Sequence, residues 1–248
     1  MAPNPLRMGR LSTAAGSFVM VPLDHGASMG PLEGLEDPAH VLRAAAKGGA
    51  TCVTLHKGLV RHAAEAARDL GVLLHLSAST DRAPDPQDKR LVATVAEALR
   101  LGCDGVSIHV NLGSLTEARQ LEDAGRVATA CTEWGMPLVA MVYPRGPKVK
   151  DPHDPDLVAH AARLGAELGA DAVKVPYTGS ADSFRAVVQG CPIPVLVAGG
   201  PKRATTTAFL KDMRDAKKAG AKGVSVGRNV FQQKDPVAAL RAIAELFP

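Results

Sequence analysis

One pattern, repeated seven times along the chain, limits the possible folds more than any other feature. In each copy a helix-like stretch ends at a glycine, a short turn follows, and a run rich in Val, Leu and Ile begins. Glycine just after a helix adopts the left-handed conformation without a steric penalty, so it marks helix ends. With the opening run at 18–23, the pattern predicts strands that start near residues 18, 52, 72, 105, 137, 172, 194 and 223.

These starts lie about 29 residues apart, which is the length of one strand–helix unit. Most of the runs are continuously apolar, as expected for strands that are covered on both faces. No linker divides the chain, so we expect residues 1–248 to form a single domain, a (β/α)8 TIM barrel of the α/β class. An open doubly wound sheet is the alternative, but the first strand is not followed by its usual G-x-G-x-x-G turn.

Two local signals complete the expected architecture. Asp-Pro pairs predict helix starts, because Asp caps a helix and Pro suits its first turn. They occur at 37–38, 85–86, 154–155 and 235–236. Residues 1–16 precede the first strand, and we expect this N-terminal cap segment to plug the barrel bottom or to lie in an interface.

Composition excludes several classes of function. The 29 basic and 25 acidic side chains give a net charge of +4, and aromatic residues make up 3% of the chain. A nucleic-acid partner is therefore not expected, since no basic stripe interleaved with aromatic residues is present. The four cysteines form no C-x-x-C pair, and no apolar run is long enough for a membrane span. These features favour a cytoplasmic protein without a membrane partner.

The carboxyl ends of barrel strands carry the chemistry in this fold class. Lys174 is the strongest signal there, because the valines on either side face the helices and its own side chain therefore points into the barrel. Burial disfavours an ammonium, and a neutral amine attacks a carbonyl to form a Schiff base. A structural lysine that reaches solvent or a carboxylate is the alternative.

Two further side chains are expected beside this lysine. Tyr143 ends the preceding strand and could exchange protons with atoms bonded to the lysine nitrogen, or could equally be a rim tyrosine packed under a loop. Asp24 ends the first strand and could orient the amine, act as a base or cap the next helix. Together the three residues predict a nucleophile, an acid and a base at one rim.

The last two strands end in residues suited to a phosphate group. Gly199-Gly200 and Gly227-Arg228 offer backbone N–H groups just before expected helix starts, and Arg228 adds a planar cation. Phosphate sites are frequent at this place in barrels.

Three histidines support a rival hypothesis. His56, His75 and His109 lie near the ends of three successive strands and could hold zinc in a metal-dependent lyase. That hypothesis leaves Lys174 and Tyr143 without a role, and buried histidines are often simply hydrogen-bonded, here to Ser77 or Asn111. We therefore expect no metal and no cofactor. A barrel that binds sugar phosphates without catalysis is a further alternative, although the buried lysine counts against it.

Six strings resemble the archaeal-type class I aldolase family, in order and over nearly the whole chain. They are Val-Pro-Leu-Asp-His-Gly-Ala-Ser-Met-Gly-Pro (21–31), Leu-His-Lys-Gly (55–58), Met-Val-Tyr-Pro-Arg-Gly (141–146), Val-Lys-Val-Pro-Tyr-Thr-Gly (173–179), Val-Ala-Gly-Gly-Pro-Lys (197–202) and Val-Gly-Arg-Asn-Val-Phe-Gln (226–232). The resemblance implies a Schiff base on Lys174, proton donation by Tyr143, proton acceptance by Asp24, and a large homo-oligomer such as a decamer.

The resemblance also implies which residues contact a phosphorylated substrate. They are Asp24, His25, Gly26, Ala27, Ser28, Tyr143, Pro144, Arg145, Gly199, Gly200, Gly227 and Arg228. Lys57, Lys148 and Lys202 have no assigned role; Lys57, Lys148 and Arg145 could contact a carboxylate or a second phosphate, or could be solvated rim charges.

The residues after Asp-His-Gly bear on the substrates. Fructose-bisphosphate aldolases of the family typically continue with Glu-His-Gly-Pro, whereas this chain reads Ala-Ser-Met-Gly-Pro at 27–31. The difference resembles those members that join L-aspartate semialdehyde to a three-carbon unit from a phosphorylated ketose, toward aromatic amino acids. A related member uses dihydroxyacetone phosphate, toward aminohydroxybenzoate-type secondary metabolites. A class I fructose-bisphosphate aldolase is the alternative.

Overall fold

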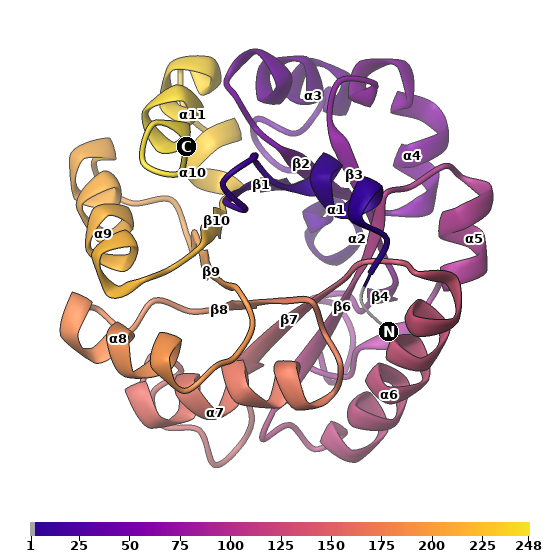
Figure 1. Cartoon of the computed structure of the whole chain (residues 1–248), viewed down its shortest axis with the longest axis vertical. Coiled ribbons are helices and arrows are strands. Elements are labelled where there is room, and N and C mark those ends of the chain that lie inside the picture. Colours follow the sequence, from indigo (N-terminus) through magenta and orange to yellow (C-terminus); the bar gives the residue numbers. More distant parts are fainter. Residues whose placement is uncertain (1–2) are drawn as a thin grey trace.

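Eight parallel strands close into a barrel in the computed structural model, which describes residues 3–248 (Figure 1). The strands are β1 (Phe18–Pro22), β2 (Cys52–Leu55), β3 (Gly71–His75), β6 (Gly105–Leu112), β7 (Leu138–Pro144), β8 (Ala172–Val175), β9 (Val195–Ala198) and β10 (Gly223–Ser225). Around the ring they follow the order β1-β10-β9-β8-β7-β6-β3-β2. The predicted fold class and all eight predicted strands are confirmed.

Helices surround the ring of strands (Figure 1). They are α3 (Pro38–Lys47), α4 (Lys57–Ala63), the 3-10 helix η1 (Glu65–Ala67), α5 (Val95–Arg100), α6 (Glu117–Trp134), α7 (Pro155–Glu167), α8 (Ala181–Gln189), α9 (Thr206–Ala219), α10 (Arg228–Phe231) and α11 (Pro236–Ala244), with the short α2 (His25–Met29) after β1. No helix in this part of the chain is long and apolar enough to cross a membrane.

Three of the four expected Asp-Pro helix starts are confirmed. The carboxylates of Asp37, Asp154 and Asp235 accept hydrogen bonds from backbone N–H groups of the first turns of α3, α7 and α11. The prediction is wrong at Asp85, which lies in an irregular segment where its carboxylate accepts from the N–H of Gln87. The helix that follows, α5, starts ten residues later behind Thr94, where Thr94 and Glu97 form a reciprocal capping box.

This irregular segment belongs to an additional hairpin-like feature that was not predicted. After β3 the chain forms β4 (Ser77–Ala78), which pairs antiparallel with β5 (Arg90–Leu91). The segment between them, residues 79–89, is anchored to α2 by the N–H of Asp81, which donates to the carbonyl of Ser28 at 2.9 Å. It therefore lies over the carboxyl ends of the strands.

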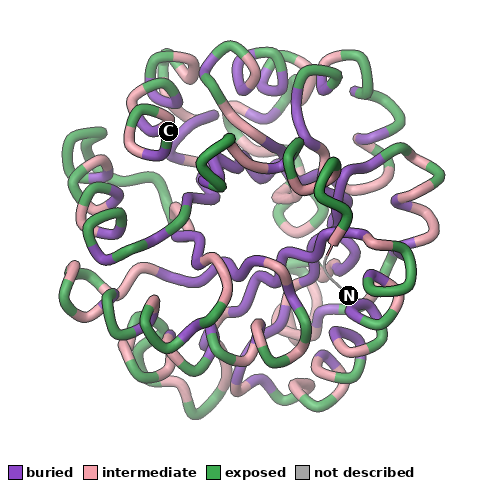
Figure 2. The backbone as a smooth tube through the Cα atoms, viewed as in Figure 1, coloured by how far each residue is buried: buried purple, intermediate pink, exposed green. Residues whose placement is uncertain are grey.

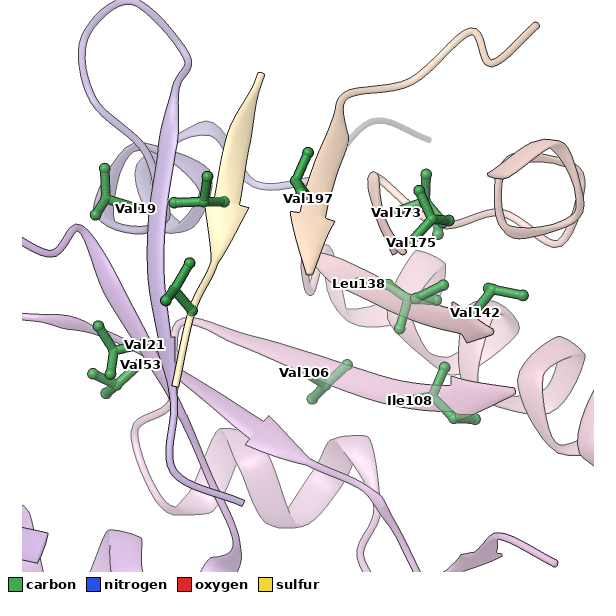
Figure 3. Packing of buried hydrophobic residues seen from close by; sticks show 14 of the residues in the cluster. Val19, Val21, Val53, Val106, Ile108, Leu138, Val142, Val173, Val175 and Val197 are labelled. Atoms are coloured by element: carbon green, nitrogen blue, oxygen red, sulfur yellow. The ribbon is translucent and has the colours of Figure 1, made fainter. Parts of the chain in front are cut away.

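The strands separate two apolar clusters. The larger cluster lies between the strands and the helices and includes Val173 and Val175 of β8, with Figure 3 showing part of it. Figure 2 shows the same division, with buried backbone along the barrel wall and exposed positions on the outer faces of the helices. The smaller cluster fills the barrel interior with Leu11, Phe18, Met20, Cys52, Leu73, Val139, Ala172 and Leu196. Six of the eight strands, all but β6 and β10, thus send side chains to both clusters.

Helix α1 (Pro5–Leu11) lies against β3 and β6, at the end of the barrel where the strands begin. Arg10 Nε bonds to the carboxylate of Asp104 at 2.7 Å, and Arg7 donates to the carbonyl of Cys103 at 2.6 Å. The last residue of the helix, Leu11, is fully buried in the interior cluster. This leucine closes the barrel at the end where the strands begin, and the cavity lies at the end where the strands finish.

Replacing Leu11 by alanine is expected to lower the free energy of unfolding by about 2–5 kcal/mol, because it leaves a cavity in a closed interior. Leu6 lies on the same helix and is 80% exposed, so Leu6→Ala is the matched control and is expected to change stability little. Chemical denaturation of both variants measures the difference. Equal effects of the two substitutions would contradict the plug role of Leu11.

Candidate active site

A cavity of about 800 Å³ opens at the carboxyl ends of the strands. The predicted nucleophile, acid and base all line it: Lys174, Tyr143 and Asp24. So do eight of the ten other residues expected to contact the substrate, namely His25, Ser28, Pro144, Arg145, Gly199, Gly200, Gly227 and Arg228. Gly26 and Ala27 lie in α2, are exposed, and are not among the lining residues.

Lys174 sits on the inner face of β8 and is 7% exposed. Its backbone pairs with Met141 of β7, and its Nζ lies 3.9 Å from Met141 Sδ. No carboxylate of residues 3–248 approaches Nζ within ion-pair distance. The amine therefore faces the cavity with only a thioether sulfur, a weak hydrogen-bond acceptor, as its neighbour. The amine is thus available to react with a ligand.

Tyr143 lies two residues beyond Met141 on β7, and so on the same inner face. Lys174 Nζ is 6.0 Å from the centroid of its ring. The ring also packs against the imidazole of His109, with centroids 4.9 Å apart, and under the guanidinium of Arg145 at 4.6 Å. These contacts fix the ring, so that Tyr143 is held beside the lysine at the cavity wall.

Asp24 follows β1 and faces two imidazoles. His75 Nε2 lies 3.8 Å from Asp24 Oδ2, and His25 Nδ1 lies 3.9 Å from Oδ1. Burial acts to raise the pKa of Asp24, but the attraction of His75, His25, Lys174 and His56 outweighs it and holds the pKa well below its usual range. Asp24 is therefore a carboxylate at neutral pH, a good partner for a cation and a weak base.

The three histidines of the metal hypothesis are engaged with polar neighbours. His75 Nδ1 lies 2.8 Å from Ser107 Oγ, and His109 Nε2 lies 2.8 Å from Asn111 Oδ1. The rings of His56 and His75 pack edge to face. Burial lowers the pKa of all three, that of His75 to about 4. No group of His, Cys, Asp or Glu side chains in residues 3–248 is arranged to hold a metal ion.

The ends of β9 and β10 form a polar cradle on one side of the cavity. Gly200 has φ of +65°, which favours glycine, and a Cβ at Gly227 would lie 2.7 Å from His25 Cε1, so a larger residue there would displace the His25 ring. Asn229 ties the two loops together, because its amide donates to the carbonyls of Gly199 and Pro201 at 2.9 and 2.8 Å. The role of Asn229 was not predicted.

Three polar atoms at or near this cradle have no hydrogen-bond partner within residues 3–248. Arg228 Nε, Ser225 Oγ and His25 Nδ1 are buried and have no hydrogen-bond partner among the described residues. Buried polar atoms are normally bonded, and all three belong to residues that line the cavity. One expected detail is wrong: no helix follows Gly199-Gly200 directly, since α9 starts at Thr206.

Three lysines without an assigned role lie outside the cavity lining. Lys57 pairs with Glu97 at 3.2 Å, Lys202 donates to the carbonyl of Gln232 at 2.7 Å, and Lys148 is exposed.

Lys89 was missed by sequence reasoning and lines the cavity. It is 9% exposed, and burial, reinforced by Arg145, lowers its pKa although Asp24 and Asp81 oppose the change. One signal could have found it: the stretch from the third strand to its helix at Val95 is long for a strand–helix loop, and such loops often carry function.

The buried histidines should make stability depend on pH. The pKa of His75 is lowered to about 4 in the folded chain. Between pH 6.5 and 4 the His75 imidazole is therefore protonated in the unfolded chain but neutral in the folded chain. Stability therefore falls as the pH falls through this window. In His75→Asn the slope should be smaller by about 1.4 kcal/mol per pH unit. Denaturation at several pH values measures it, with the exposed His62→Asn as control; an unchanged slope in His75→Asn would contradict this assignment.

Comparison with known proteins agrees with this site. The model of the DeoC/LacD family aldolases matches residues 18–233. The chain is 44% identical to the 2-amino-4,5-dihydroxy-6-oxo-7-(phosphonooxy)heptanoate synthase of Streptomyces griseus, over 99% of this chain and 92% of that protein. It is 46% identical to the 2-amino-3,7-dideoxy-D-threo-hept-6-ulosonate synthase 1 of Archaeoglobus fulgidus, over 96% and 88%.

A solved structure extends the likeness to the mechanism. An archaeal fructose-1,6-bisphosphate aldolase, solved with its catalytic lysine covalently bound to the carbinolamine intermediate, superimposes with a TM-score of 0.92 at 33% identity and covers 98% of each chain. The predicted resemblance and the predicted class I, Schiff-base aldolase chemistry are confirmed. The chain belongs to the DeoC/LacD family of aldolases.

Proposed function

We propose that this enzyme forms a Schiff base between Lys174 and a phosphorylated ketose donor and transfers a three-carbon unit to L-aspartate semialdehyde, as a 2-amino-3,7-dideoxy-D-threo-hept-6-ulosonate synthase does. One observation carries the proposal. Lys174 is buried at the inner wall of a cavity, without a carboxylate partner in the described residues, beside Tyr143 and next to the cradle of β9 and β10.

The reaction uses few groups. The amine of Lys174 adds to the donor ketone, and loss of water from the carbinolamine gives a protonated imine. In a ketose the bond between the α and β carbons then breaks: the β-hydroxyl gives up its proton, the β carbon leaves as an aldehyde, and an enamine remains. In a triose, removal of a proton from the α carbon gives the enamine directly. The enamine carbon attacks the acceptor aldehyde, the new alkoxide takes up a proton, and water hydrolyses the imine to release product.

Each neighbour has a role in this sequence. Tyr143 moves protons to and from the carbinolamine oxygen and the alkoxide. Asp24, ionised at neutral pH, stabilises the protonated imine as its counter-ion. The unpartnered Arg228 Nε and Ser225 Oγ bind the donor phosphate together with the backbone of Gly199, Gly200 and Gly227. No step calls for a metal ion, because the imine cation is itself the electron sink.

The names of the relatives define the acceptor chemistry. A 2-amino-4,5-dihydroxy-6-oxo-heptanoate made by aldol chemistry must form its bond between carbons 4 and 5, next to the ketone. Carbons 1–4 then come from an aldehyde with a carboxylate and an amine, which is aspartate semialdehyde. The two products differ at carbon 7, which carries a phosphate in one name and no oxygen in the other. The mass of the product therefore distinguishes the two donors.

The aldolase is further proposed to be cytoplasmic and to assemble as a homo-oligomer of decamer size. All four cysteines are free and buried, which suits a reducing compartment. The family resemblance supports the assembly, and light scattering after size-exclusion chromatography measures it. The same resemblance supports one domain over residues 1–248.

Replacing Lys174 by methionine should abolish turnover, by at least about a thousandfold, since the covalent nucleophile is lost. Borohydride should trap dihydroxyacetone phosphate or fructose 1,6-bisphosphate on the Lys174 peptide of the wild type and not on the variant, as read by mass spectrometry. EDTA should change neither turnover nor trapping. Residual activity above a few per cent in Lys174→Met, or loss of activity in EDTA, would overturn the assignment.

Replacing Tyr143 by phenylalanine should slow turnover by about 100- to 10,000-fold, the range for loss of a general acid–base group. The chain contains one other tyrosine, Tyr177, which also lines the cavity and packs its ring on Phe184, so Tyr177→Phe is the matched comparison and is expected to slow turnover less than Tyr143→Phe. Steady-state kinetics compares the two. Similar rates for both variants would show that Tyr143 is only a packed rim residue.

A further inference from the structure

Lys89 is a second buried lysine that the proposed mechanism does not use. Its Nζ donates to Ser79 Oγ at 2.5 Å, and no carboxylate of the described residues lies within ion-pair distance. An ammonium has three N–H donors, so two remain for the cavity that Lys89 lines. A buried cation without a counter-ion is costly unless a ligand supplies the negative charge.

Side chains of β6 and α6 form hydrogen bonds to the backbone around Lys89. The carbonyl of Gln87 accepts from Asn111 Nδ2 at 2.9 Å and from Gln120 Nε2 at 2.8 Å. Arg119 of α6 donates to the carbonyl of Lys89 at 2.9 Å and pairs with Asp88. These hydrogen bonds from β6 and α6 hold the backbone at Lys89 in place, and the bond to Ser79 holds its Nζ at the cavity wall.

The ring order places Lys89 across the cavity from the phosphate cradle. Residues 79–89 follow β3 and rest on β6 and α6, whereas the cradle lies at the ends of β9 and β10. In the ring, β6 is four strands from β10, and β3 is four strands from β9, so these pairs stand opposite. Lys174 of β8 lies between the two ends. A linear substrate joined to Lys174, with its phosphate in the cradle, directs its other end toward Lys89.

We propose that Lys89 binds the carboxylate of the acceptor aldehyde and thereby selects an amino-acid aldehyde as the acceptor. The proposal rests on the function proposed above. Arg145 lines the same cavity and adds positive charge near Lys89. Asp81 lines it as well and supplies a carboxylate that suits the acceptor ammonium group. The acceptor end of the cavity thus matches both charges of an α-amino acid, while the donor end matches a phosphate.

Matched acceptors test this assignment. L-Aspartate semialdehyde carries both charged groups, succinic semialdehyde keeps only the carboxylate, and butanal has the same four carbons with neither. In Lys89→Met the KM for the first two should rise about 10- to 100-fold, as expected for loss of one charge-assisted hydrogen bond. The KM for butanal should not rise. Lys148→Met is the control, because Lys148 is exposed outside the cavity.

Trapping of the donor separates failure of this inference from failure of the proposed function. Borohydride adduct formed on Lys174 with dihydroxyacetone phosphate should equal the wild type in Lys89→Met, which also shows that the variant is folded. Ser79→Ala, which removes the anchor of Nζ, should raise the same KM values more mildly. If the wild type itself gives no adduct on Lys174, or gives it on Lys89, the proposed function fails.

Two results would overturn the inference while the aldolase function stands. One is an unchanged preference for succinic semialdehyde over butanal in Lys89→Met. The other is a larger rise in KM for glyceraldehyde 3-phosphate than for succinic semialdehyde in Lys89→Met, which would make Lys89 part of a second phosphate site.

Discussion

The alternation of side chains along the closed parallel barrel is the constraint on which the rest of the site depends. In β8 it directs Val173 and Val175 to the helices and leaves Lys174 inside, where its amine faces the cavity and has no carboxylate of the described residues within ion-pair distance. Because the strands are parallel, their carboxyl ends meet at one face, and Tyr143 and Asp24 reach the same cavity. Leu11 fills the opposite end, so the interior is open on one side only.

The electrostatic environment of Asp24 gives the site one negative charge at neutral pH. Four histidines in and around the cavity, of which His75 is buried and the others half-buried, have their pKa values lowered by loss of solvent, so they donate and accept hydrogen bonds at neutral pH without adding charge. Asp24 remains ionised among them. Asp24 lines the same cavity as Lys174 and is then the natural counter-ion for an imine cation there, and the surrounding apolar barrel strengthens that interaction.

The cavity is polar at both ends for different reasons. At β9 and β10, glycine backbone and the unpartnered Arg228 and Ser225 atoms suit a phosphate. At the opposite side, a segment outside the barrel repeat supplies Lys89, held by hydrogen bonds from β6 and α6. The barrel therefore fixes the nucleophile and the donor site, while an inserted segment is positioned to recognise the acceptor.

The repeat, the eight strands, the inward direction of Lys174 and most of the cavity-lining residues at strand ends can all be predicted from the amino-acid sequence, because they follow from local periodicity and from glycine and proline chemistry. The sequence predicted a helix start wrongly at Asp85, where the same Asp-Pro chemistry stabilises a turn within residues 79–89. Only the tertiary structure decided that Gly26 and Ala27 face solvent, that Asn229 joins two loops, and that Lys89 reaches the cavity. Those placements depend on contacts between segments far apart in the chain, such as Gln87 with Asn111 and Gln120, which no local pattern encodes.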